Sequence, residues 1–197
     1  MKKNRSYISE VEVGQLNAAP GGTVVEVPAP ADNGISKDAP TVVVEVNVIP
    51  SQSQPWLFEV QNGREGGSEV SANIHFDFVE SETSDPVLVA CQRAIVIYTM
   101  PPRALEDDGV TWRFANPGIL MEQDVAHEQY RMTHVASKDG SQLRVTIDQV
   151  SGEPSPSFPS VEFRLVAIRY RFKSKKPSRA KVYVSQDPLI GVGRSKH

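Results

Sequence analysis

Four histidines and one cysteine are the residues of this sequence whose side chains most often act in catalysis or bind transition metals. His75 and Asp77 stand two residues apart in the alternating run at 69–80, so we expect both on one strand face, where a carboxylate could orient an imidazole for acid–base chemistry. Exposed strand faces often carry such pairs. The histidines also follow no metal-ligand spacing, such as H-E-x-x-H. We therefore predict a protein that is not an enzyme, with no catalytic residues and no cofactor.

Cys91 lies in the most apolar segment, residues 86–102, which we predict to be a long strand covered on both faces. A buried thiol behaves as a small hydrophobic group and its thiolate is disfavoured, so Cys91 is predicted to be a core residue rather than a nucleophile. Carboxylates that could together bind calcium or magnesium are Glu106, Asp107, Asp108 and Asp124. A solvated acidic loop is the alternative. Because the ligand order of a known calcium loop is absent, we predict no metal site.

The charge of the chain is divided unevenly along its length. Residues 163–197 hold ten Lys or Arg against one acid, a net +9, and residues 1–162 hold eleven basic against twenty-three acidic residues, a net −12. Clustered cations suit the phosphates of nucleic acid or the acidic surface of a neighbouring copy, although a solvated strand face is the alternative. The residues predicted to make such contacts are Lys173, Lys175, Lys176, Arg179 and Lys181.

A long strand, predicted from Val161 to Phe172, leads into this basic segment. Its apolar phase slips by one residue near Val166, which predicts either a β-bulge or cover on both faces. Beyond the slip we expect the rings, such as Tyr170, in the core and the cations on the open face. Stacking on bases needs rings and cations on one accessible surface, so only non-specific, charge-based contact with nucleic acid is predicted.

Several further segments have the local pattern of a defined element. Residues 41–50 and 56–60 are predicted strands, with Trp56 or Phe58 reaching the core. Asp139-Gly140 separates two alternating runs and predicts a hairpin with a type I′ turn, in which both central residues need positive φ. Residues 116–129 are the one segment predicted to form a helical turn or two.

Together these segments predict an all-β protein. About nine or ten strands, joined by connections rich in Pro and Gly, favour an antiparallel two-sheet sandwich of the jelly-roll kind, with barrels and other sandwiches as alternatives. The expected organisation is a flexible N-terminal arm at 1–22, a β-sandwich domain at 23–186 and a C-terminal tail at 187–197. Residues 179–186 are expected to add a short final strand to the sandwich domain. A single cysteine rules out an intrachain disulfide, and we see no signal peptide or membrane span.

The layout resembles that of the single jelly-roll coat proteins of small viruses. The resemblance covers most of the chain and rests on its size, its strands and an arm that begins with Lys2, Lys3 and Arg5. It implies a subunit that assembles into a shell and is found in the virion and the host cytoplasm. Two departures stand out: the arm lacks a dense arginine cluster, and the basic excess lies at the opposite end of the chain.

We therefore predict a structural protein whose partners are copies of itself or related coat subunits, with non-specific nucleic acid as a further partner. One alternative is a nucleic-acid-binding protein of the viral movement type. Another is a ligand- or carbohydrate-binding β-sandwich, which exposed aromatic rings near Trp56 or Trp112 would favour and their burial would oppose.

Overall fold

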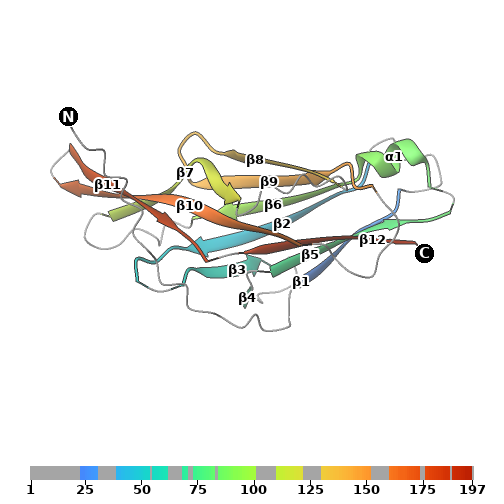
Figure 1. Cartoon of the computed structure of the whole chain (residues 1–197), viewed down its shortest axis with the longest axis horizontal. Coiled ribbons are helices and arrows are strands. Elements are labelled where there is room, and N and C mark those ends of the chain that lie inside the picture. Colours follow the sequence, from blue (N-terminus) through green and yellow to red (C-terminus); the bar gives the residue numbers. More distant parts are fainter. Residues whose placement is uncertain are drawn as a thin grey trace, which may run out of the picture.

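The computed structural model describes residues 23–30, 39–53, 55–61, 68–70, 73–82, 84–100, 110–121, 130–151, 160–173, 176–186 and 188–196. These residues form twelve strands and one short helix (Figure 1). In chain order the elements are β1 (Thr23–Val27), β2 (Thr41–Ile49), β3 (Leu57–Gln61), β4 (Ser68–Val70), β5 (Asn73–Glu80), α1 (Pro86–Cys91), β6 (Arg93–Thr99), β7 (Val110–Met121), β8 (Arg131–Ala136), β9 (Gln142–Asp148), β10 (Ser160–Lys173), β11 (Lys176–Val184) and β12 (Leu189–Lys196).

The strands form two sheets of six. One has the order β1-β5-β12-β10-β11, with β7 paired to β10 as well, and the other has the order β4-β3-β2-β6-β9-β8. The predicted all-β sandwich is therefore confirmed. Its predicted antiparallel character is wrong in part, because the pairs β1–β5, β5–β12 and β2–β6 are parallel. A jelly roll is an antiparallel architecture, so these pairs depart from it.

One hydrophobic core lies between the two sheets. The inward alternation predicted for β2 and β5 is confirmed, since Val46, Val48, Phe76 and Phe78 are all buried. Tyr98 of β6 meets Phe163 of the other sheet edge-on, with ring centres 6.3 Å apart. Such aromatic contacts across the sandwich fix how the sheets sit on one another.

A side-chain amide also ties the two sheets together, close to Trp56. The backbone N–H of Trp56 donates to Oε1 of Gln186 at 2.8 Å, and Nε2 of Gln186 donates back to the Trp56 carbonyl at 2.5 Å. Gln186 follows β11 and Trp56 precedes β3, which belong to different sheets. The Gln186 amide therefore hydrogen-bonds the backbone of one sheet to the end of a strand of the other.

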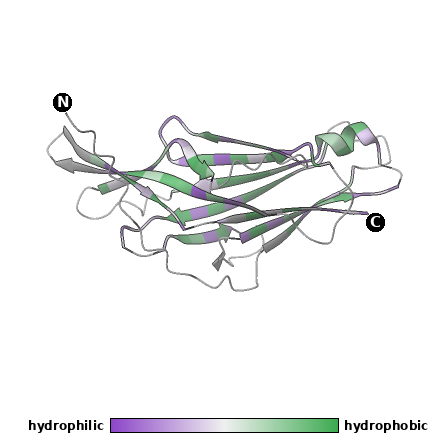
Figure 2. Ribbon diagram, in the orientation of Figure 1, coloured by the Kyte–Doolittle hydropathy of each residue, from purple (hydrophilic) through white to green (hydrophobic). Residues whose placement is uncertain are grey.

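Residues 86–102 do not form the single long strand that we predicted. Asp85 caps a helix by accepting from the Val87 N–H at 2.8 Å, and Pro86 starts it, as proline favours the first helical turn. α1 then runs to Cys91, and only 93–99 become β6. Cys91 is exposed, so its predicted core position is wrong. Figure 2 shows α1 largely green although it lies at the surface, where Val87 is 69% exposed.

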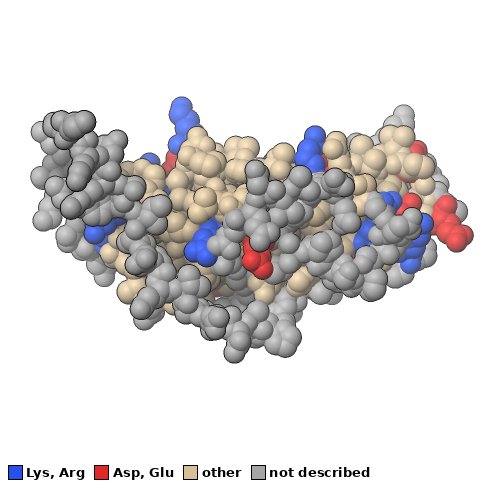
Figure 3. All heavy atoms as spheres, viewed as in Figure 1, with Lys and Arg blue, Asp and Glu red and all other residues tan. Residues whose placement is uncertain are grey.

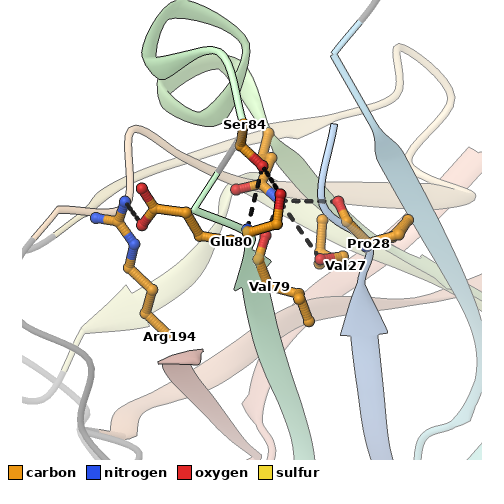
Figure 4. A network of polar contacts seen from close by, with 8 residues as sticks. Val27, Pro28, Val79, Glu80, Ser84 and Arg194 are labelled. Carbon is orange, nitrogen blue, oxygen red and sulfur yellow. Dashed lines mark hydrogen bonds and ion pairs between the residues drawn. The ribbon is translucent and has the colours of Figure 1, made fainter. Parts of the chain in front are cut away.

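Gln92, the residue after α1, hydrogen-bonds to the backbone at the point where the chain passes from one sheet to the other. Its side chain is buried, and Nε2 donates to the carbonyl oxygens of Pro28 at 2.8 Å and Val79 at 2.7 Å. The Pro28 carbonyl lies just after β1 and the Val79 carbonyl lies near the end of β5. Figure 4 shows these two segments close together at this corner. Beside them, Arg194 of β12 is hydrogen-bonded to Glu80. This corner therefore joins β1, β5, α1 and β12.

The segment from residue 116, predicted to be helical, continues β7 as far as Met121, and residues 122–129 lie outside the described part of the chain. Within β7 the register against β10 jumps: Phe114 pairs with Ala167, and Ile119 pairs with Leu165. The four residues between form a wide bulge around a cis Asn116-Pro117 bond and Gly118 at φ +87°. A Cβ on Gly118 would also lie 2.8 Å from Leu143, so glycine suits the site sterically as well.

The C-terminal third forms more strands than we predicted. Val161–Lys181 is a hairpin, since β10 ends at Lys173 and β11 begins at Lys176. The segment 187–197, predicted to be a tail, contains β12, which lies inside the sheet between β5 and β10. Figure 1 shows the β10–β11 hairpin reaching one end of an elongated molecule, with α1 at the other end. The described residues contain no helix of the length and hydrophobicity needed to cross a lipid bilayer.

The hairpin predicted around Asp139-Gly140 is confirmed, but its turn is not type I′. β8 and β9 pair with His134 opposite Val145, and of the two turn residues only Gly140 has positive φ, at +70°. The Gly140 N–H donates to the Ser137 carbonyl, which closes a β-turn over 137–140 before β9 begins. Asp139 can therefore keep negative φ, because it occupies the third position of an ordinary turn.

Asp139 gives this turn a dependence on pH. Its carboxylate accepts from the Ser137 hydroxyl at 2.7 Å and from the Ser141 N–H and hydroxyl, which lowers its pKa from 3.8 to about 2. A lowered pKa stabilises the fold fully above the unfolded value and no longer does so once the pH falls through the folded value. Asp139→Asn should therefore lower the melting temperature at pH 5, and the difference from the wild type should shrink between about pH 4 and pH 2. Thermal unfolding by circular dichroism measures it, and a difference that stays constant with pH would contradict this role.

Candidate interaction surface

The side chains of β10 divide between the core and an outer surface, but not as we predicted. Phe163, Leu165 and Ala167 are fully buried, whereas Val166 and Ile168, on the other face of the strand, are only half-buried. The predicted register slip is present next to Val166, but the extra residues belong to the β7 bulge. β10 thus keeps its own alternation through the slip, and its second apolar series turns outward.

An apolar outer face results on the sheet formed by β7, β10 and β11. Val166 lies opposite Val184, and Ile168 lies between Val182 and Arg113. Residues directly opposite in paired strands share a face, so the apolar side chains form adjoining rows. We use the name apolar outer face for Leu120, Val166, Ile168, Tyr170, Val182 and Val184; of these, Val182 is 63% exposed and Leu120 is 51% exposed.

Cations border the apolar outer face. The guanidinium of Arg113 lies 6.0 Å from the ring centre of Tyr170, in cation–π range, and Arg164 lies opposite Leu120. Rings and cations were predicted to face opposite ways, as they do along β10 alone. The neighbouring strand β7 brings Arg113 onto the ring side, which reasoning about one strand could not reveal.

The other face of the hairpin is cationic and covers the end of the core. Arg169 lies opposite Lys181, and its guanidinium is 6.0 Å from the buried ring of Trp112. With the Gln52 amide oxygen turned toward Arg169, Nη2 of Arg169 donates to it at 3.0 Å, and the amide nitrogen donates to Tyr183. Arg169 is thus held in place by its contacts, whereas Lys181 is exposed and available to a partner.

The predicted contact residues all belong to this hairpin or its turn. Lys181 is an exposed residue of β11, and Lys173 is placed opposite Lys176 by the register. Arg179 is also in β11, and Lys175 lies outside the described residues. Their role in binding stays a prediction.

β11 is the edge strand at this end of the sheet. It pairs with β10 on one side, and no described strand pairs with its other side. An edge strand presents N–H and C=O groups that another strand can pair with, and lysines on such a strand discourage unwanted pairing. The surface therefore combines an apolar face, a cationic face and an open backbone edge.

Sequence reasoning missed Leu120, Val182 and Val184 as surface residues. The sequence of β11 did indicate that Val182 and Val184 share a face. In A-K-V-Y-V the two valines alternate with Lys181 and Tyr183, so the valines lie on one face and the lysine and tyrosine on the other. Leu120 gave no such signal, because its direction depends on the β7 bulge.

His75 and Asp77 lie on one face of β5 as predicted. Asp77 accepts a hydrogen bond from the Ser195 hydroxyl at 2.9 Å, while the His75 ring packs against Gly191 of β12. In the described part of the chain, no three His, Cys, Asp or Glu side chains gather closely enough to hold a metal ion. The acidic residues weighed as cation ligands, Glu106, Asp107, Asp108 and Asp124, lie outside that part.

Both tryptophans belong to the core. Trp56 and Trp112 are each 4% exposed, and their rings meet edge-on with centres 6.2 Å apart. A sugar-binding sandwich needs exposed rings on which the ligand can stack. The burial of these two rings removes the observation that would have favoured that alternative.

A sequence model of the DP-EP family matches residues 40–194. The chain belongs to the DP-EP family. The DP-EP match takes in β2 through most of β12, and hence the whole apolar outer face, but it begins after β1 and the N-terminal residues. No curated protein matches the chain. Among solved structures, it is similar to the inclusion body protein PixA from Burkholderia cenocepacia J2315, at 7% identity and a TM-score of 0.39 over 82% of this chain and 98% of that one.

Proposed function

We propose that this DP-EP protein is a structural subunit that assembles with copies of itself through the apolar outer face. The exposure of Val182 and Leu120 on one sheet face carries the proposal, since both are large apolar side chains open to solvent within a set of rows that are otherwise half-buried. An apolar centre with Arg113 and Arg164 at its rim has the composition of a protein–protein interface.

The charge distribution favours a second copy as the occupant. The basic excess after residue 163 is matched by an acidic excess before it, so one copy offers both signs of charge. The exposed acids Glu82 and Asp85 precede α1, and Figure 3 shows acidic atoms at that end of the molecule with Lys and Arg atoms beside them. Copies meeting head to tail would bring opposite charges together, and such contacts build rings or filaments.

A narrower form of the proposal is a coat protein of a small virus, which would act in the virion and the host cytoplasm. The size and the sandwich support it, whereas the three parallel strand pairs are foreign to a jelly roll. Negative-stain electron microscopy of the assembled protein separates the forms, because closed shells, filaments and open rings look different.

Replacing Val182 by lysine is expected to disrupt the assembly. A charge buried at the centre of an apolar contact without a partner is costly, and the apparent affinity between copies should fall by about ten-fold or more. Val182 is already 63% exposed, so the fold of each copy should be almost unaffected. Size-exclusion chromatography with light scattering, over a range of protein concentrations, measures the mass.

Val135→Lys is the matched control, because Val135 is 68% exposed on β8 of the other sheet. It should leave the assembly intact. A wild-type chain that stays monomeric at every concentration and ionic strength would overturn the proposal, and equal effects of the two lysines would place the contact elsewhere.

A further inference from the structure

α1 presents a second apolar surface, at the end of the molecule opposite to the β10–β11 hairpin (Figure 1). Val87 and Cys91 are four residues apart, so they share one face of the helix, and Ala90 lies next to them. All three side chains are exposed, whereas Val89 is buried and holds the helix against the protein. We use the name α1 knob for Val87, Ala90 and Cys91. A free thiol packs as a small hydrophobic group, so the α1 knob is apolar throughout.

Acidic side chains lie beside the α1 knob. Glu82 and Asp85 are exposed, and within the described residues neither forms an ion pair. Arg93, which follows the helix, and Arg194 do not supply one, because each pairs with a carboxylate of the sandwich. The α1 knob therefore offers a partner an apolar centre with negative charge at its edge.

The apolar outer face has the complementary composition. Val182 and Leu120 are open to solvent within its apolar rows, and Arg113 and Arg164 lie at its border. An apolar centre with cations at the rim fits an apolar centre with acids at the rim. Contact between them buries the apolar atoms and brings opposite charges together.

α1 cannot occupy the apolar outer face of its own chain. Gln92, next to the helix, is hydrogen-bonded to the backbone after β1 and near the end of β5, so α1 is anchored at its own end of the sandwich. We propose that the α1 knob of one copy docks on the apolar outer face of the next copy, with Glu82 and Asp85 toward the arginines at its rim.

The docking of α1 deepens the proposed assembly and rests on it, because it names what the apolar outer face binds. The contact joins two different surfaces, so every added copy leaves one α1 knob and one apolar outer face open. Such a contact propagates into a filament, or closes into a ring where the rotation between copies allows it.

Complementation between two blocked variants tests the docking in the full-length chain. Val87→Lys puts a charge into the α1 knob, and Val182→Lys puts one into the apolar outer face. At a concentration where the wild type is just assembled, each variant alone should be monomeric, because its apparent affinity falls by about ten-fold or more. Mixed in equal amounts, the two should form a dimer and nothing larger, since only one pair of native surfaces remains between them. Size-exclusion chromatography with light scattering measures the mass.

The outcomes separate the docking of α1 from the proposed assembly. Lysine has a higher helix propensity than valine, and Val87 is exposed, so Val87→Lys should keep its fold, which circular dichroism checks. Assembly of Val87→Lys like the wild type, together with a monomeric Val182→Lys, would overturn the docking and leave the assembly standing. A mixture that stays monomeric would also overturn the docking. A wild type that is monomeric at every concentration would overturn both.

Native Cys91 allows an independent measurement by cross-linking. It is the sole cysteine, so Val182→Cys adds one further thiol, in the apolar outer face. With diamide as oxidant, Cys91 of one chain should link to the new thiol of the next. Dimers and larger species should then form on the order of a hundred-fold faster than with Val135→Cys, the control on the other sheet. Val184→Cys covers the neighbouring position of the face, and linking of both test variants at the rate of the control would count against the docking.

Removing the native thiol identifies the partner in the link. Val182→Cys made together with Cys91→Ser should form no linked species, because each chain then has a thiol on only one of the two docking surfaces. A linked dimer in that background would mean that two apolar outer faces meet each other. That result would overturn the docking of α1 but not the assembly.

Discussion

Replacing Gln92 by leucine is expected to destabilise the protein by roughly 3 kcal/mol or more, the largest loss that we predict for one side chain. Leucine has a similar volume, so the packing changes little, but the carbonyl oxygens of Pro28 and Val79 lose the amide that donates to them. A buried acceptor without its partner costs about 1–3 kcal/mol. Chemical denaturation followed by tryptophan fluorescence measures the loss, because Trp56 and Trp112 are both in the core.

Gln142→Leu serves as the control for this prediction. Gln142 lies exposed on β9 and donates to Thr99 at a long 3.4 Å, so its replacement should cost only a few tenths of a kcal/mol. A loss at Gln92 no greater than at Gln142 would mean that the corner at α1 tolerates unpaired carbonyls and does not lock the two sheets together.

Gly191→Ala should also destabilise the protein, by about 1–3 kcal/mol, through steric overlap. A Cβ at Gly191 would lie 2.1 Å from Nδ1 of His75, so either the imidazole or the pairing of β5 with β12 has to move. The variant is made in the wild-type background, and its free energy of unfolding is compared with that of the parent by denaturant titration.

The double variant Gly191→Ala with His75→Ala isolates the cause. Removing the ring makes room for the new methyl group, so the double variant should be more stable than Gly191→Ala alone. If the two losses simply add, the cost comes from the backbone of β12 and not from the contact with His75.

Local alternation predicted the strands well wherever one face of a strand packs against the opposite sheet and the other face does not. In β2 and β5 the buried residues are those that alternation chose, since a period of two has only one way to place an apolar series in the core. The hairpin of β8 and β9 was equally readable. Its turn type was not, because Asp-Gly also fits a turn in which only glycine needs positive φ.

Alternation failed where the answer depended on a distant part of the chain. A short apolar run fits a helix or a strand, and only the Asp85 cap and Pro86 mark 86–91 as helix. Ile168 faces outward because β10 keeps one alternation throughout, and the irregularity lies in a bulge of β7 about fifty residues earlier, which no inspection of β10 could reveal. The parallel strand pairs are likewise a matter of topology, which local pattern does not encode.

The candidate surface was therefore only half predictable. Composition located the basic hairpin and named Lys181, which is exposed. The apolar outer face escaped because the same residues, read along one strand, looked like core. Both faces of β10 carry apolar side chains. Only the arrangement of the neighbouring strands decides which of its two alternating sets of side chains meets solvent.

The position of β12 also bears on how the protein is made. A ribosome delivers β5 and then β10 well before β12, yet β12 lies between them and carries the parallel ladder to β5. Until residues 189–196 emerge from the exit tunnel, β5 has only β1 to pair with and offers a long unpaired edge. The nascent chain is thus exposed to pairing with other chains until β12 has been made, and a chaperone that shields strand edges would be of most use to it before that point.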